Sequence, residues 1–240
     1  MQALILAAGK GTRMRPLTDD RPKPMVHLLG KPILAHAIEC LPKEITEVVV
    51  VIGYHGEKIK EYFGSSYNER AISYVEQREN KGPAHALFTA REALTSDPFL
   101  LAAGDNVNVF SIPSYIHPGS YVLYVHSHQE PYRFGVVELT EDGKRVKNIE
   151  EKPESPASNL ISTGTMILGK DVFNLSLTLH KERGEYFMPP VVMQAVSEGI
   201  PVSVEEQTLW IGVDSPGDIP VAELELARFL EKKGLGKNDA

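Results

Sequence analysis

Glycine and basic residues concentrate in the first loop of the chain, where together they could bind an anion. Residues 3–7 form a short apolar run typical of a buried strand, and Gly9 and Gly11 follow it directly. Two glycines two positions apart allow a tight turn whose free N–H groups face a ligand. The cations of this region are Lys10, Arg13, Arg15, Arg21, Lys23 and Lys31. The pattern predicts a site for a small, highly charged anion at the end of a strand.

The charge of the whole chain narrows the class of anion. The formal net charge is −7, whereas a nucleic-acid-binding protein would carry a broad basic face, so we expect no nucleic acid partner. A dinucleotide fingerprint would require glycine where the chain has Met14, and no stretch matches a Walker loop. The first loop therefore belongs to neither of these two common phosphate-binding motifs.

The longer stretch from Leu6 to Thr18, followed by Pro22-Lys23-Pro24-Met25, resembles the signature of the sugar-1-phosphate nucleotidyltransferases. The resemblance extends from residue 2 to about residue 220. It implies that the first loop wraps a nucleoside triphosphate and that Arg13 and Lys23 contact its phosphates. The nucleotide-binding residues so implied are Leu6, Ala7, Ala8, Gly9, Gly11, Thr12 and Arg13, and the catalytic residues are Arg13, Lys23 and Asp105.

Two aspartates are the expected ligands of a Mg²⁺ cofactor. Asp105 follows an apolar run at the carboxyl end of a predicted strand, where open α/β sheets build their sites. Mg²⁺ prefers one or two carboxylates together with phosphate oxygens of the substrate. The usual family pattern for the second ligand is Trp-x-Asp-Val-Gly-Thr-Pro, but Gly212 holds that position here and Asp214 lies two residues further on. Residues two apart on a strand share a face, so we expect the metal ligands to be Asp105 and Asp214, with Asp218 as a first-turn helix residue.

Further segments resemble the family's base-reading and sugar-binding elements. Gln77 and Gly82 would address the nucleobase, because an amide can both donate to and accept from a pyrimidine edge. The residues that the resemblance assigns to the sugar phosphate are Gly135, Glu151, Lys152, Thr163, Gly164 and Glu185.

The pattern of apolar runs predicts an α/β protein. Strands at 3–7, 48–52, 72–75 and 99–103 alternate with helices that begin near residues 30–32, 56 and 83, which favours a parallel sheet with helices on both faces. Further strands are expected at 121–125, 134–139, 145–150 and 162–168, and helices at 171–177, 188–197 and 216–233. The resemblance implies a Rossmann-like, three-layer nucleotidyltransferase fold with a mainly parallel, mixed sheet.

One domain is expected over residues 1–233, with a nucleotide-binding half (1–110), a sugar-phosphate-binding half (111–233) and a frayed tail (234–240). No apolar run approaches the roughly 18 residues of a membrane span, and no secretory signal is present, so we expect a cytoplasmic protein without membrane contact. The single cysteine, Cys40, lies in an apolar helical pattern and is expected to be buried. A homo-oligomer is a family expectation only.

The favoured activity is the transfer of a nucleotidyl group from dTTP or UTP to glucose-1-phosphate, with release of pyrophosphate. Two alternatives stay open: a cytidylyl- or guanylyltransferase acting on another phosphorylated substrate such as mannose-1-phosphate, and a regulatory subunit that binds sugar nucleotides without catalysis. The position of the aspartate at residue 214, two residues after the usual one, favours the cytidylyltransferases. Glycine in place of aspartate at residue 212 favours the regulatory subunit. The pair His126 and His128 could ligate zinc but lacks a third ligand at a matching spacing. The chain also lacks the hexapeptide repeats of many relatives, so no acyltransferase is expected.

Overall fold

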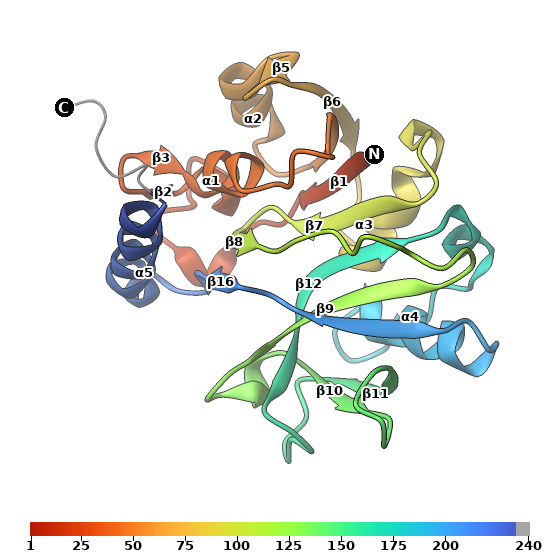
Figure 1. Cartoon of the computed structure of the whole chain (residues 1–240). Coiled ribbons are helices and arrows are strands. Elements are labelled where there is room, and N and C mark those ends of the chain that lie inside the picture. Colours follow the sequence, from red (N-terminus) through yellow and green to blue (C-terminus); the bar gives the residue numbers. More distant parts are fainter. Residues whose placement is uncertain (234–240) are drawn as a thin grey trace.

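The computed structural model describes residues 1–233, and its centre is one mixed sheet of ten strands (Figure 1). Eight strands follow the order β11-β10-β12-β7-β1-β4-β6-β5, and β9 pairs with both β12 and β15. Four adjacent strands run parallel: β7 (Phe99–Ala103), β1 (Gln2–Ala7), β4 (Glu47–Ile52) and β6 (Arg70–Glu76). The short β5 (Ser66–Tyr67) closes one edge in antiparallel pairing.

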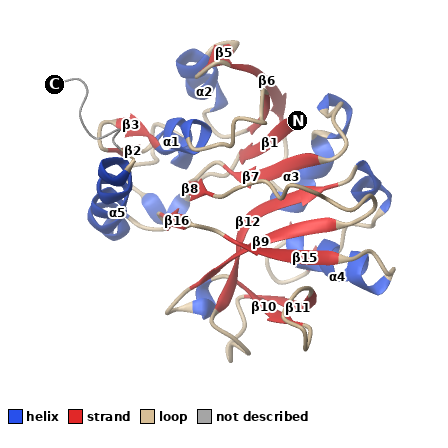
Figure 2. Ribbon diagram, viewed as in Figure 1, coloured by secondary structure: helices blue, strands red, loops and turns tan. Residues whose placement is uncertain are grey.

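Helices cover both faces of the parallel part (Figure 2). Leu4, Val49 and Val51 face one side, where they share a core with α3 (Pro83–Thr89) and α4 (Met188–Ser197). Their alternating neighbours on β1 and β4 face the other side, where α1 (Ile33–Glu39) and α2 (Gly56–Phe63) pack. Strands buried on both faces read as continuous apolar runs. The predicted three-layer α/β fold is confirmed.

The second half of the chain extends the same sheet with mostly antiparallel strands. Strand β12 (Leu160–Leu168) pairs with β7, β9 (Tyr121–Ser127) and β10 (Gly135–Leu139), and β10 pairs with β11 (Val146–Glu151). Strand β15 (Val202–Glu206) runs parallel to β9. The β12–β9 register shifts between Ser162 and Met166. Because β7 and β12 pair, the sheet is continuous across the two predicted halves, whose separate roles stay a prediction.

A third apolar cluster lies beside the sheet, under the last helix. It joins α5 (Ile219–Lys232) to the ribbon of β8 (Asn106–Val109) and β16 (Leu209–Gly212) and to the hairpin of β2 (His27–Leu28) and β3 (Lys31–Pro32). Another small hairpin, β13 (Leu179–His180) with β14 (Glu185–Tyr186), precedes α4.

Several predicted elements differ from the observed ones. The helix expected at 171–177 is a 3₁₀ helix, Lys170–Asn174. The helix that begins at residue 83 was expected to run to about residue 94 but ends at Thr89, and the last α-helix begins at Ile219 after a 3₁₀ turn. Strands β8, β15 and β16 were not predicted. The expected frayed tail lies outside the described residues. Within residues 1–233 no helix is both long enough and apolar enough to span a membrane.

Candidate active site

The first loop closes against the Pro-Lys-Pro segment. Gly11 has φ +61°, and a Cβ at this position would lie 2.7 Å from the Cβ of Lys23, so only glycine allows the approach without displacement. The Thr18 hydroxyl donates to the Gly11 carbonyl at 2.8 Å and fixes the loop. Gly9 and Thr12 are exposed, whereas Ala7 and Ala8 are buried at the end of β1.

The β8–β16 ribbon brings the two predicted metal ligands together. Asn106 pairs with Gly212, so the antiparallel ladder places Asp105, just before β8, beside the loop that begins at Val213 and carries Asp214. The two strands missed from the sequence thus assemble the pair that was predicted. Alternation of polar and apolar residues in Asn106–Val109 is the signal that could have identified β8.

Lys23 joins the two carboxylates. Its Nζ donates to Asp105 Oδ2 at 2.7 Å and to Asp214 Oδ1 at 3.4 Å, and its side chain is 9% exposed. Arg13 makes a bidentate pair with Asp214, at 3.2 Å from Nη1 and 3.1 Å from Nη2. Burial alone would raise the pKa of Asp214, but the combined attraction of Lys23, Arg13 and Arg133 holds it below its ordinary value.

Asp218 holds the loop of Asp214 in place. Its Oδ2 accepts hydrogen bonds from the backbone N–H of Asp214 at 2.9 Å and from that of Ser215 at 2.7 Å. The Ser215 side chain completes a capping box at the 3₁₀ turn Pro216–Asp218. Asp218 is therefore a capping residue, in agreement with the first-turn role expected for it.

The donor set at this point fits Mg²⁺ better than zinc. Asp105 and Asp214 supply two hard carboxylates on a common cation, which leaves coordination positions for phosphate oxygens. Among residues 1–233 no group of three or more His, Cys, Asp or Glu side chains could hold a metal, so His126 and His128 have no third ligand there.

Gly212 makes room for Trp210. A Cβ on Gly212 would lie 2.6 Å from Cη2 and 2.8 Å from Cζ2 of the indole ring. A side chain at this position would therefore require the indole ring of Trp210 to move from the place it takes here.

The two residues expected at the nucleobase are bonded to each other. Gln77 is 4% exposed, and its Nε2 donates to the Gly82 carbonyl at 3.1 Å and lies 2.9 Å from His85 Nδ1. The backbone N–H of Tyr186 donates to the Lys81 carbonyl at 2.8 Å. This bond ties the expected base-reading turn to β14, which carries Glu185.

Most residues expected at the sugar phosphate lie around one cavity. Gly135 pairs with Glu151 across the β10–β11 hairpin, and Lys152 Nζ lies 3.4 Å from Glu151 Oε1. Thr163 is 2% exposed and its hydroxyl donates to the Tyr124 carbonyl at 2.9 Å, so that hydroxyl is occupied in the free protein. Glu185 lines an adjoining groove and not the main cavity.

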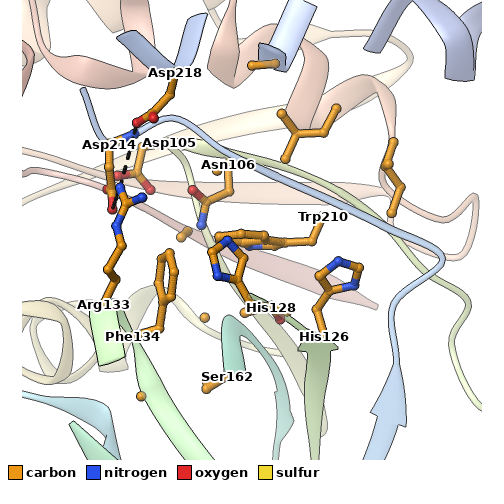
Figure 3. A pocket seen from close by; sticks show the side chains of 18 of the residues that line it. Asp105, Asn106, His126, His128, Arg133, Phe134, Ser162, Trp210, Asp214 and Asp218 are labelled. Carbon is orange, nitrogen blue, oxygen red and sulfur yellow. Dashed lines mark hydrogen bonds and ion pairs between the residues drawn. The ribbon is translucent and has the colours of Figure 1, made fainter. Parts of the chain in front are cut away.

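The main cavity measures about 830 Å³ and continues around β16 toward α5. Figure 3 shows Asp105, Asp214 and Asp218 at one side and His126, His128 and Trp210 at another. The lining residues that sequence reasoning did not assign to the site include Asn106, His126, His128, Arg133, Phe134 and Trp210. Of these, Arg133 and Phe134 belong to the segment 132–137, which resembles a sugar-phosphate segment of the family, but only Gly135 in it was given a role.

The sequence profile of the family described as "Nucleotidyl transferase" matches residues 2–219. The chain therefore belongs to the nucleotidyl transferase family, and the resemblance of the first loop to the sugar-1-phosphate nucleotidyltransferases is confirmed.

Two curated relatives illustrate how this family varies in length. "UTP--glucose-1-phosphate uridylyltransferase AglF" of Haloferax volcanii is 35% identical over 236 residues, which covers 94% of this chain and 96% of that protein. "Bifunctional protein GlmU" of Methanocaldococcus jannaschii is 36% identical over 234 residues, which covers 97% of this chain and 55% of that protein. This chain spans about half the length of the GlmU relatives that it matches.

Solved structures agree in fold. A putative glucose-1-phosphate thymidylyltransferase from Bacillus anthracis, in complex with a sucrose, superposes with a TM-score of 0.82 at 21% identity, covering 100% of this chain and 97% of that one. A UDP-glucose pyrophosphorylase complexed with UDP-glucose gives a TM-score of 0.79 at 24% identity, covering 95% of this chain and 98% of that one.

Proposed function

We propose that this protein transfers a nucleotidyl group from a nucleoside triphosphate to a sugar-1-phosphate and releases pyrophosphate. The observation that carries the proposal is the ion-pair cluster of Arg13, Lys23, Asp105 and Asp214. Three of its members, Arg13, Asp105 and Asp214, line the same cavity as Glu151 and Lys152, and this shared cavity supports the proposal.

The reaction needs positioned charge more than acid–base catalysis. A phosphate monoester has a second pKa of about 6, so its oxygen is already ionised at neutral pH. That oxygen forms a bond to the α-phosphorus while the bond from the α-phosphorus to the β-phosphate oxygen breaks, and pyrophosphate leaves. The protein must align two anions that repel each other and stabilise the charge of the transition state.

The chain's own residues suit these tasks. Asp105 and Asp214 would hold Mg²⁺, which when bound supplies charge neutralisation at the reacting phosphates. Lys23 and Arg13 would then contact the triphosphate, and Lys152 would bind the sugar phosphate. The capped loop of Asp218 keeps Asp214 in position.

We further propose UTP or dTTP as the nucleotide and glucose-1-phosphate as the sugar. The Haloferax relative matches over nearly its whole length, and its name specifies UTP and glucose-1-phosphate. Gln77 Nε2 is committed to Gly82 and His85, while its Oε1 has no hydrogen-bond partner among the described residues and can accept from the N3–H of uracil or thymine.

A guanylyltransferase is the second candidate, since "Mannose-1-phosphate guanyltransferase beta-B" of Xenopus laevis is 32% identical over 228 residues and is covered to 62% of its length. A grid of nucleoside triphosphates and sugar-1-phosphates, read as Mg²⁺-dependent pyrophosphate release, separates the candidates. We expect the highest rate with UTP or dTTP and glucose-1-phosphate. A highest rate with GTP and mannose-1-phosphate would replace the finer proposal, and silence in every pair would favour the non-catalytic binding subunit.

A further inference from the structure

Arg133 is a cation of the candidate site to which the resemblance gave no role of its own, although it lies in a segment, residues 132–137, that resembles a sugar-phosphate segment of the family. It ends the 3₁₀ turn Pro131–Arg133, one residue before Phe134 and two before Gly135. It lines both the main cavity and the adjoining open groove, and in the groove it stands with Arg13, Lys152 and Arg183. Figure 3 shows its side chain extending toward Asp214 and Asp218.

The guanidinium of Arg133 lies near three carboxylates, but most of its N–H donors make no hydrogen bond to them. Nη1 donates to Glu130 Oε2 at 3.0 Å. Nη2 lies 3.6 Å from Asp214 Oδ2 and 3.9 Å from Asp218 Oδ2, which are ion-pair distances beyond hydrogen-bond range. A guanidinium has N–H donors on each of its nitrogens, so most donors of Arg133 make no hydrogen bond within the described residues.

The surroundings hold this side chain in position while leaving it accessible. Its guanidinium carbon lies 5.7 Å from the centre of the Phe134 ring, and its side chain is 31% exposed. A cation held against an aromatic ring loses less conformational freedom when it binds a ligand. The guanidinium of Arg133 is therefore held at the cavity wall and accessible to a ligand.

Asp214 serves three cations at once in the free protein: Arg13, Lys23 and Arg133. If Asp214 holds Mg²⁺, as the proposed function requires, the metal cancels the negative charge that attracts these cations. Phosphate oxyanions of the substrates are then the partners of opposite charge in the cavity. Of the three cations, Arg133 is the one beside the β10–β11 hairpin and Lys152.

We propose that Arg133 is a further substrate-binding residue whose guanidinium moves from Asp214 and Asp218 to an oxyanion of the substrate phosphate. This inference rests on the proposed function. The phosphate is that of the sugar-1-phosphate or one of the triphosphate, and the position of Arg133 beside Lys152 favours the sugar-1-phosphate. Arginine suits this task because its planar fork can bind two phosphate oxygens together.

The test compares Arg133→Gln and Arg133→Lys with a matched control, Arg91→Gln. Arg91 likewise lies near a glutamate, at 3.8 Å from Glu92 Oε1, and above a phenylalanine ring, at 5.8 Å from the centre of Phe173, but it lies outside both cavities. Dissociation constants are measured by calorimetry for glucose-1-phosphate, for inorganic phosphate and for UTP with Mg²⁺. Steady-state KM and kcat are measured where turnover exists.

We expect Arg133→Gln to weaken binding of glucose-1-phosphate and of inorganic phosphate about tenfold or more, with Arg133→Lys between it and the wild type. The binding of UTP with Mg²⁺ and the melting temperature without ligand should change little, and Arg91→Gln should behave as the wild type. A loss confined to UTP would assign Arg133 to the triphosphate instead.

Unchanged binding of all three probes in Arg133→Gln would overturn the inference. The inference would also be overturned if Arg133→Lys lost as much affinity as Arg133→Gln and both variants had a lower melting temperature. That result would indicate that Arg133 stabilises the fold and does not bind the substrate. A wild-type protein that binds inorganic phosphate in an Arg133-dependent manner but neither substrate would contradict the proposed function and leave Arg133 as an anion-binding residue.

Discussion

Lys23 links the two carboxylates of the candidate site. Its ammonium group pairs with both Asp105 and Asp214, and its side chain is almost fully buried between them. In the proposed reaction Mg²⁺ would take the place of this ammonium group between the carboxylates, and Lys23 would then contact the reacting phosphates.

We therefore expect Lys23→Ala to reduce kcat much more than nucleotide affinity. Removal of one group that stabilises transition-state charge typically lowers kcat about 10²–10³-fold, whereas Arg13 and the loop would retain most of the ground-state binding. Steady-state kinetics and direct nucleotide titration measure the two effects. Lys147→Ala is the control, because Lys147 is 65% exposed and, among residues 1–233, pairs only with Glu138 on the β10–β11 hairpin. Equal losses of turnover and affinity would contradict this role for Lys23.

Cys40 was expected to be buried, but the residue is only partly buried at the end of α1. Burial raises the pKa of Cys40 to about 11. At pH 8 a thiol with that pKa is about one-thousandth ionised, whereas an ordinary thiol of pKa about 8.5 is roughly a quarter ionised. The reaction of the folded protein with Ellman's reagent should be roughly 100-fold slower than that of the urea-unfolded chain. Similar rates in the two states would show that the thiol is accessible and ordinary.

At the scale of elements, the β8–β16 ribbon and the loop that follows it bring together Asp105 and Asp214, the two predicted metal ligands. The packing of Trp210 over Gly212 in this ribbon predicts a cost for any side chain at position 212. Gly212→Ala should lower the free energy of unfolding by about 1–3 kcal/mol, the usual range for overpacking. The penalty should shrink in a Trp210→Phe background, because the atoms that Cβ would meet belong to the six-membered ring of the indole.

The free energies of unfolding of the wild type, the two single variants and the double variant are measured by urea unfolding. Circular dichroism is used as the signal, because Trp210 fluorescence is lost in Trp210→Phe. Gly217→Ala is the control, because within the described part of the chain its Cβ would meet only Ser215 Oγ, at an ordinary contact distance of 3.7 Å. The same penalty in both backgrounds would show that the contact with Trp210 is not its cause.

The parallel core was predictable from the sequence, and the assembly of the site was only partly so. Runs such as Val48–Ile52 are apolar without interruption because both faces are covered, and this pattern identifies central strands without knowledge of their neighbours. Strands β8, β15 and β16 are short, and β8 and β15 alternate polar with apolar residues in windows that loops also produce. Their pairing partners lie about 80 to 105 residues away, as for Asn106 with Gly212, so local reasoning could not identify them.

The contacts of individual side chains were likewise only partly predictable from the sequence. The roles of Arg13, Lys23, Asp105 and Asp214 were inferred from a family pattern, and the structure brings their charged groups into one cluster. Arg133, the third cation near Asp214, received no role because it is 81 residues from Asp214 in the chain and only the folded structure brings the two side chains together.

At the scale of the whole molecule, a continuous sheet joins residues from both halves of the chain into one cavity. Asp105 follows β7 in the first half, and Asp214 follows β16 in the second. A protein with a formal net charge of −7 must concentrate its cations locally if it acts on the highly anionic substrates proposed here. The structure does so around Asp214.

The central claim is that Asp105 and Asp214 form a magnesium-dependent centre for nucleotidyl transfer. The most direct measurement is the rate of pyrophosphate release as a function of Mg²⁺ concentration in the wild type, Asp105→Asn, Asp214→Asn and the exposed-turn control Asp142→Asn. We expect no release without Mg²⁺, and in both site variants a loss of about 100-fold or more together with a higher half-saturating Mg²⁺ concentration. Asp142→Asn should match the wild type. A wild-type level of release in Asp214→Asn, or release that persists in the absence of a divalent metal, would contradict the account.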